Sequence, residues 1–373
     1  MLYHWMMIRI LSLAIGIIFF IGSVGQCKEL PPRALFVSVI QKPPVLSSRT
    51  DIIKLIDYAK QAGIKILFVQ IYHGGKAWFP SKIADDSFYK DYLKSLHEDP
   101  FSLLIQKAHA QGIEVHAWLN LMSLGGNKDA IFLKKYGTDI LTRNQNKKTS
   151  LDDFKIDNQY FLEPGDPRVR DDLGKIVKEI LLTYPDLDGI QFDYIRYPDV
   201  HPHYGYTKIN MERFKKVYPL ENITENNLIW QNWRRAQVTE VLTKLVSIVR
   251  SQRPKMQVST TGCMPYARAY YEANQDWAFW INSGLIDFVT VMDYATDLKV
   301  YERWVKALKE KVKDESKMKL TVGAEKLVLL PQIFEQEFVS CESMSPTCVV
   351  FHYGNLFESP AIKDFLITHK KSL

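Results

Sequence analysis

The chain has 373 residues, of which 46% are hydrophobic and 12% aromatic, a composition typical of a globular protein with a large core. Its 48 basic and 42 acidic residues are interspersed and give a net charge of only +6. Local pairs such as Lys147-Lys148 and Lys215-Lys216 are therefore interpreted as solvated surface, and a nucleic-acid-binding track is excluded. The length allows one large domain or two modest ones.

The first segment has the pattern of a secretory signal peptide. Arg9 precedes an apolar run over 10–21, and small residues follow at Ser23-Val24-Gly25. We therefore expect residues 1–25 to be removed on export, which makes the protein periplasmic or extracellular. The apolar run is short for a membrane span, and no later segment predicts one.

Residues 26–32 are predicted to form a short N-terminal tail before the folded domain. Cys27 in this tail raises the alternative of a lipid anchor, but Gln26 before it fits a lipobox poorly. Export permits disulfides. Cys341 and Cys348 flank a turn-rich stretch, so we expect a local disulfide between them.

The rest of the chain alternates β-rich and helical segments. In chain order, we predict a strand at 34–39, a helix at 51–61, a strand at 64–72, a helix at 100–110, a strand at 113–120, a long excursion over 121–163, a helix at 167–183, a strand ending at Asp193, a second excursion over 199–227, a helix at 228–250, a strand at 256–261, a helix at 275–283, a strand at 286–294, a helix at 300–312, and strands at 320–324 and 348–353.

Eight strands in this order predict the α/β class and one (β/α)8 TIM barrel over 33–373, with extended loops after the third and fourth strands. An open doubly wound sheet is the alternative, but no G-x-G-x-x-G turn follows an early strand.

Polar residues recur on one face of five predicted strands. Since side chains alternate along a strand, the polar sets are Gln70 and Tyr72; His116, Trp118 and Asn120; Gln191 and Asp193; Ser259 and Thr261; and Thr321, Gly323 and Glu325. Parallel barrels place their chemistry at the carboxyl ends of the strands. We therefore expect Asp193, His116, Asn120 and Glu325 to line one cleft at that rim.

Carboxylates, amides and aromatic rings are the side chains that act on and bind sugars. Candidate stacking residues are Tyr72, Trp78, Trp118, Tyr194 and Tyr294. The sequence has no G-x-S-x-G elbow and no phosphate loop, so serine and nucleotide chemistries have no support. It also has no C-x-x-C or H-E-x-x-H pattern, so these motifs do not support a structural or catalytic zinc site.

Five segments together resemble the bacterial glycosyl hydrolase-like 10 family. They are Phe68–Ile71, His116–Asn120, Leu162–Arg170, Asp188–Pro198 and Trp233–Arg235. The resemblance implies a glycosidase-like barrel with the aspartate of the fourth strand, Asp193, as the leading catalytic residue.

The first functional hypothesis is a glycoside hydrolase that cleaves a bacterial or environmental polysaccharide. Asp193 is one catalytic carboxylate, Glu325 is our choice for the second, and Asp293 is the fallback. One must protonate the leaving oxygen while the other acts as nucleophile or base. No cofactor or metal is required. Candidate substrate-binding residues are Tyr72, His73, His116, Trp118, Asn120, Gln191, Tyr194, Arg196 and Tyr294.

Two alternatives stay open. The first is a non-catalytic polysaccharide-binding protein on a degenerate barrel, which needs a stacking platform without two opposed carboxylates. The second is a metal-dependent hydrolase that uses His201, His203 and Asp199, although histidines two apart on a loop are more often solvent-exposed than metal ligands.

Overall fold

The computed structural model describes residues 30–146 and 148–369, and the chain from Pro31 onwards forms one compact unit. The predicted signal peptide, Cys27 and most of the tail lie outside the described residues. Within the described ranges, no helix has the length and apolar character needed to cross a membrane.

Among the described residues, eight parallel strands close into a barrel in the order β1-β9-β8-β7-β6-β5-β4-β2, and β2 pairs back with β1. The short β3 adds to β2 in antiparallel fashion. The bounds are β1 Arg33–Val37, β2 Ile64–His73, β3 Lys76–Ala77, β4 Glu114–Asn120, β5 Gly189–Asp193, β6 Gln257–Cys263, β7 Phe288–Asp293, β8 Met318–Gly323 and β9 Cys348–Phe351. The predicted barrel is confirmed.

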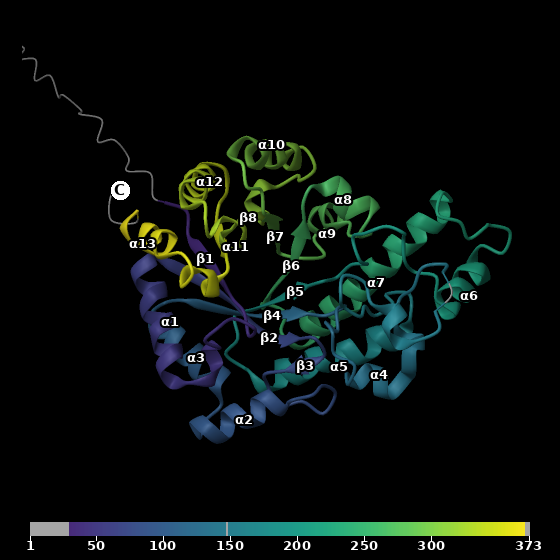
Figure 1. The fold of residues 1–373 in the computed structure, drawn as a ribbon, viewed down its shortest axis with the longest axis horizontal. Helices are drawn as coiled ribbons and strands as arrows, with labels where there is room; N and C mark the ends of the chain where they lie inside the picture. The colour runs from purple at the N-terminus through teal and green to yellow at the C-terminus, as the bar shows by residue number, and fades with distance from the viewer. Residues whose placement is uncertain (1–29, 147, 370–373) are drawn as a thin grey trace, which may run out of the picture. The chain divides into compact units, whose positions relative to one another are not determined.

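Helices surround the strands (Figure 1). Their bounds are α1 Arg49–Ala62, α2 Ser87–Leu96, α3 Pro100–His109, α4 Ile131–Tyr136, α5 Pro167–Thr183, α6 Lys208–Val217, α7 Leu228–Gln252, α8 Tyr266–Tyr271, α9 Trp277–Asn282, α10 Leu298–Lys309, α11 Ala324–Leu327, α12 Pro331–Met344 and α13 Pro360–Thr368. The sequence analysis missed α2, α4, α6, α8, α11, α12 and α13.

Local signals explain where the long helices begin. The side chain of Ser48 accepts the Asp51 amide at the start of α1. Asp166 caps α5 and is followed by Pro167, whose fixed φ suits the first turn. The α1 helix ends at Gly63, which has the left-handed φ of +73° that glycine adopts without steric cost.

The barrel interior holds both apolar and polar side chains. An aromatic cluster of Phe36, Phe68, Trp118 and Phe288, with the smaller Ala34, Ile66 and Val349, fills its centre. The outward faces of the strands pack on the helices in the larger hydrophobic core. These side chains fill the interior below the rim, and a pocket opens at the carboxyl ends of the strands.

The extended loops after β4 and β5 pack on each other above the barrel. The main-chain amides of Gly205 and Tyr206 both donate to the Arg143 carbonyl. Buried Glu163 accepts hydrogen bonds from the Tyr197 hydroxyl and from the Thr142 side chain, and burial raises its pKa. These contacts give the loops a fixed shape beside the strand ends.

A disulfide joins Cys341 near the end of α12 to Cys348 at the start of β9, with Cα atoms 5.9 Å apart. Both residues are fully buried. The bond therefore holds the last barrel strand to the helix that precedes it.

Candidate active site

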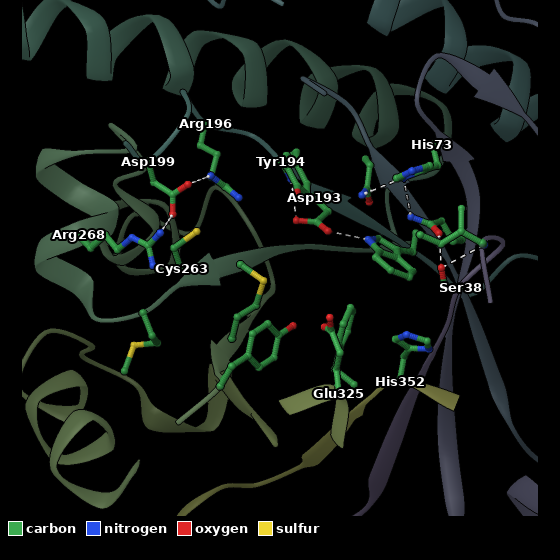
Figure 2. A pocket seen from close by; sticks show the side chains of 18 residues that line it. Ser38, His73, Asp193, Tyr194, Arg196, Asp199, Cys263, Arg268, Glu325 and His352 are labelled. Atoms are coloured by element: carbon green, nitrogen blue, oxygen red, sulfur yellow. Dashed lines mark hydrogen bonds and ion pairs between the residues drawn. The ribbon is translucent and has the colours of Figure 1, made fainter. Parts of the chain in front are cut away.

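A pocket of about 350 Å³ opens at the carboxyl ends of the barrel strands. Its lining comes from β2, β4, β5, β6, β7 and β9 and from the segments that follow β1, β5, β6, β7, β8 and β9. Figure 2 shows the side chains of Asp193, His73, Glu325 and His352 pointing into this space. A site at this rim is what the strand alternation predicts.

Asp193 ends β5 and has only 4% of its surface exposed. Its Oδ2 accepts the indole N–H of Trp118 at 2.9 Å. Its Oδ1 accepts the Tyr194 main-chain N–H at 2.7 Å and the Thr261 hydroxyl. An ionised carboxylate accepts hydrogen bonds and donates none, so this set of three donors matches a negatively charged Asp193.

The residue after Asp193 turns the chain sharply. Tyr194 has φ +56°, a left-handed conformation that costs a residue with a side chain roughly 1–2 kcal/mol. This turn directs the Tyr194 amide back to Asp193 and leaves the half-buried tyrosine ring at the pocket wall. A strained residue beside a buried carboxylate is typical of a functional site.

Glu325 is the second carboxylate in the pocket. It lies in the first turn of α11 directly after β8 and is exposed. The sequence analysis placed it on a strand, so its secondary structure was predicted wrongly although it does reach the rim. Burial, followed by the charges of Asp193 and Glu325, raises the pKa of Tyr294 well above its usual range. The charges of both carboxylates therefore contribute to the raised pKa of the same pocket tyrosine.

Three polar side chains form a network on the opposite wall. The Nδ1 atom of His73 lies 3.3 Å from the amide nitrogen of Gln70 and 3.3 Å from that of Asn120. Since amide nitrogens donate, Nδ1 is the acceptor and Nε2 carries the proton. Burial lowers the pKa of His73, with the charge of Asp193 opposing it, so a neutral imidazole is favoured at pH 7.

Asn120 has a buried side-chain oxygen without a hydrogen-bond partner among the described residues. Its Oδ1 is buried and makes no hydrogen bond within the described part of the chain. A buried acceptor without a partner costs free energy unless a ligand or water satisfies it.

Charged residues form the rim on the other side. Asp199 pairs with Arg196 at 2.7 Å and with Arg268 at 2.7 Å. The Arg196 guanidinium also lies 4.5 Å from the centre of the Tyr194 ring, in cation–π geometry. These contacts fix both arginines at the edge of the pocket.

The structure adds pocket residues that the sequence analysis missed. They are Ser38, Ile40, Cys263, Met264, Arg268, Met292, Phe351 and His352. Burial raises the pKa of the Cys263 thiol to about 11 and lowers that of His352 to about 4. Most of these residues stand at or just after the carboxyl end of a predicted strand, so the rule used for Asp193 would have found them.

Two predicted substrate-binding residues lie too deep in the barrel. His116 is fully buried, packs against Phe68 and Phe288, and fills the space left by the absent side chain of Gly189. Gln191 is also fully buried, where it hydrogen-bonds to interior hydroxyl groups. The prediction that they line the cleft is wrong because alternation along a strand gives the face of a side chain but not its depth.

A β-bulge changes the face of Tyr72. Gln70 pairs with Trp118, but the register then shifts so that Tyr72 pairs with the outward residue Leu119. Tyr72 is therefore buried in the outer core, and His73 takes the inward place. The prediction that Tyr72 contacts substrate is wrong for this reason.

Neither of the two tryptophans predicted to stack on sugars, Trp78 and Trp118, has an open ring face. Trp78 is 4% exposed and stacks on Phe88 outside the pocket. Trp118 lines the pocket floor but is only 3% exposed, with its ring edge-on to Phe36. Trp118 therefore orients Asp193 through its N–H, whereas Tyr194 and Tyr294, both half-buried in the pocket lining, retain the expected position for stacking.

Asp293 is not in the pocket. It is fully buried on the outward face of β7, and its neighbours Met292 and Tyr294 line the pocket instead. Burial raises the pKa of Asp293 to about 8. The fallback choice of Asp293 as a catalytic carboxylate is contradicted by this placement.

The three residues of the metal-hydrolase alternative do not come together. Both oxygens of Asp199 are paired with arginines, as described above. His201 and His203 instead face Glu272, and the three side chains form a candidate metal-binding group. His201, His203 and Glu272 all lie outside the lining of the pocket that contains Asp193.

Comparisons with known proteins agree with this geometry. The model of the family described as "Glycosyl hydrolase-like 10" matches residues 35–338. The chain is 24% identical over 305 residues to glycosyl hydrolase DigH of Escherichia coli, covering 73% of this chain and 67% of the relative. It is 25% identical over 270 residues to glycosyl hydrolase YngK of Bacillus subtilis, covering 67% of this chain and half the length of YngK.

Solved structures show the same fold at low sequence identity. The glycoside hydrolase domain of PgaB (BpsB) from Bordetella bronchiseptica is similar with a TM-score of 0.67 and 14% identity, covering 90% of this chain and 98% of the domain. The catalytic domain of a β-amylase from Paenibacillus polymyxa is similar with a TM-score of 0.56 and 11% identity, covering 91% and 98% of the two chains.

Proposed function

This chain belongs to the glycosyl hydrolase-like 10 family, and on that basis we propose that it is a glycoside hydrolase that cleaves a polysaccharide by carboxylate acid/base catalysis. The observation that carries the proposal is the meeting of Asp193 and Glu325 in one pocket at the carboxyl end of the barrel (Figure 2). Two carboxyl groups flanking the scissile bond are the usual requirement for glycoside hydrolysis.

The surroundings of the two carboxyl groups suggest different roles. Asp193 is held by three donors as an acceptor, which suits a nucleophile or a general base. Glu325 is exposed at the pocket wall, which suits a residue that exchanges a proton with the leaving oxygen and then with solvent. We therefore assign Glu325 as the acid and Asp193 as its opposed carboxylate.

The remaining lining fits a sugar. Neutral His73 has a proton on Nε2, and the exposed carboxylate of Glu325 provides acceptor oxygens. Tyr194 and Tyr294 supply aromatic walls for the C–H faces of a ring. Hydroxyl groups need both donors and acceptors, which this pocket provides within one space.

A neighbouring groove favours an extended substrate. Met264 lines both the pocket and a second hollow of about 440 Å³, whose wall includes Tyr266, Tyr270, Tyr271 and Trp304. Tyr271 is 58% exposed. A chain of sugars that leaves the pocket over Met264 would meet successive aromatic faces, so we assign the substrate to oligosaccharides or polysaccharides.

The test is hydrolysis of a panel of bacterial and environmental glycans, measured as the release of reducing ends. On the glycan that the parent protein cleaves, Asp193→Asn and Glu325→Gln should each lower kcat by about 10²–10⁴-fold. Asp57→Asn, which changes an exposed carboxylate on α1, is the matched control and should leave kcat unchanged. Retained turnover in both pocket variants would contradict the assignment.

One observation favours the binding alternative. Because both oxygens of Asp193 are occupied by donors, the residue could serve only to organise the pocket floor. A non-catalytic polysaccharide-binding protein would bind a glycan of the panel without releasing reducing ends. Its affinity would fall when the tyrosines are truncated, and product would form with none of the glycans.

A further inference from the structure

We propose that His201, His203 and Glu272 form a binding site for a divalent transition-metal ion of the zinc type, outside the pocket that contains Asp193. One ligand atom from each of the three residues lies within 4.8 Å of the others. Imidazole and carboxylate are both established zinc ligands. Three protein ligands would leave one position of a tetrahedral ion for water.

The distances between the ligand atoms fit such an ion. The Nε2 atom of His201 lies 2.9 Å from Glu272 Oε2, and the Nε2 atom of His203 lies 3.1 Å from the same oxygen. With zinc–ligand bonds of about 2.0–2.1 Å, the ligand atoms of a tetrahedral site are roughly 3.3 Å apart. The two imidazole rings, with centroids 4.5 Å apart, would need to move only slightly.

A fourth residue supports the assignment independently. The Nδ1 atom of His203, on the side of the ring away from Glu272, lies 3.0 Å from Glu225 Oε1. Metal-binding histidines usually donate their other ring N–H to a carboxylate, which fixes the tautomer and leaves the lone pair toward the metal. Glu225 already accepts the His203 main-chain N–H at 3.1 Å, and the buried Nδ1 atom, which makes no hydrogen bond among the described residues, lies close enough to turn toward the same carboxylate when a metal binds.

Charge also favours a cation. Glu225 and Glu272 bring two carboxylates to the cluster, and a divalent ion would balance their charge. The His203 side chain is only 11% exposed, whereas that of His201 is 64% exposed. The site would therefore be anchored by His203 and open to solvent at His201, which gives an ion a path of entry.

The position of the site suggests what the metal would do. Glu272 stands one helical turn after Arg268, at the end of α8, and His201 follows Asp199 by two residues. Arg268 and Asp199 already form an ion pair at the pocket rim. A metal would add a second link between the segment after β5 and α8, so we assign it a structural role in holding this rim.

The test is zinc binding by the full chain, purified without a histidine tag and treated with a chelator. Titration calorimetry with Zn²⁺ should give one saturable equivalent, and Co²⁺ should give the visible absorption of a four-coordinate ion. His203→Ala and Glu272→Gln should each weaken Zn²⁺ binding by more than about 100-fold, and Glu225→Gln by about 10–100-fold. Zn²⁺ should also slow hydrogen exchange over residues 199–205.

The matched control is His109→Ala. His109 is another surface histidine paired with a carboxylate, at 2.8 Å from Asp188. It does not belong to the cluster of His201, His203 and Glu272. Its loss should leave Zn²⁺ affinity unchanged. Absence of saturable binding, or affinity that persists in both His203→Ala and Glu272→Gln, would overturn the proposal. Circular dichroism on each variant ensures that lost binding is not lost folding, and no readout depends on glycan hydrolysis.

Discussion

Replacement of Asp193 by asparagine should damage both stability and catalysis, and the two effects can be separated. Asp193 accepts the Trp118 N–H on one oxygen and the Tyr194 N–H on the other. An asparagine side chain has a single oxygen, so its NH₂ group must face one of these N–H donors. That buried donor then loses its acceptor, which costs about 1–3 kcal/mol. We expect Asp193→Asn to lower the free energy of unfolding by this amount.

A double-mutant cycle tests this origin of the cost. In a Trp118→Phe background the indole donor is gone, so the asparagine NH₂ can face the phenylalanine without meeting an N–H. The stability cost of Asp193→Asn should therefore be smaller there than in the parent protein, with a coupling energy of about 0.5–3 kcal/mol. Glycan turnover should remain about 10²–10⁴-fold below the parent in the double variant, because the carboxylate is absent.

The assay is equilibrium unfolding in urea and initial-rate hydrolysis on the same preparations. Additive stability effects, with no coupling between Asp193→Asn and Trp118→Phe, would refute the reasoning about the donors. Turnover of Asp193→Asn within tenfold of the parent would refute the catalytic assignment of Asp193, whatever its stability.

Two further predictions concern buried residues outside the pocket. Burial raises the pKa of Asp293 and that of Glu337, each to about 8. Carboxyl groups in the unfolded chain release their protons near pH 4, so the folded state holds more protons than the unfolded state between about pH 4 and 8. The free energy of unfolding should therefore fall as pH rises through this range, by up to about 1.4 kcal/mol per pH unit for each group. The double variant Asp293→Asn/Glu337→Gln should flatten this slope in urea unfolding measured from pH 5 to 9, and an unchanged slope would contradict the assignment. Gly189→Ala should destabilise the barrel by about 1–3 kcal/mol or more, because its Cβ would lie 2.3 Å from His116 Nδ1. Gly126→Ala is the control, because a Cβ at Gly126 would have its nearest neighbour at 3.6 Å. Equal thermal midpoints for the two alanine variants would contradict the predicted clash between a Cβ at Gly189 and His116.

The sequence alone predicted the barrel, because each strand carries its own signal. Period-two alternation and turn residues between segments are local properties, and eight such strands alternating with helices have few ways to bury their apolar faces. The same local rule placed Asp193 and Asn120 at the carboxyl ends of adjacent strands, where the structure also has them. These predictions required no knowledge of which strands pair.

Depth and register depend on contacts between distant residues, so only the tertiary structure decided them. His116 points inward as alternation predicts, but it lies opposite Gly189 at the level where β5 begins, far below Asp193 at its end. The bulge in β2 moved Tyr72 to the outer core and gave its place to His73. No local pattern in 64–73 marks this one-residue shift, because it is set by pairing with β4.

The tertiary structure also decided which charged residues meet. Asp199 and His201 are two residues apart, yet one pairs with Arg196 and Arg268 while the other faces Glu272. The reason is physical: a loop has no repeating geometry, so the partner of each side chain is fixed by the segment that packs against it. Here α8 lies against the loop after β5, and its Arg268 and the adjoining Glu272 determine both the pocket rim and the candidate metal site.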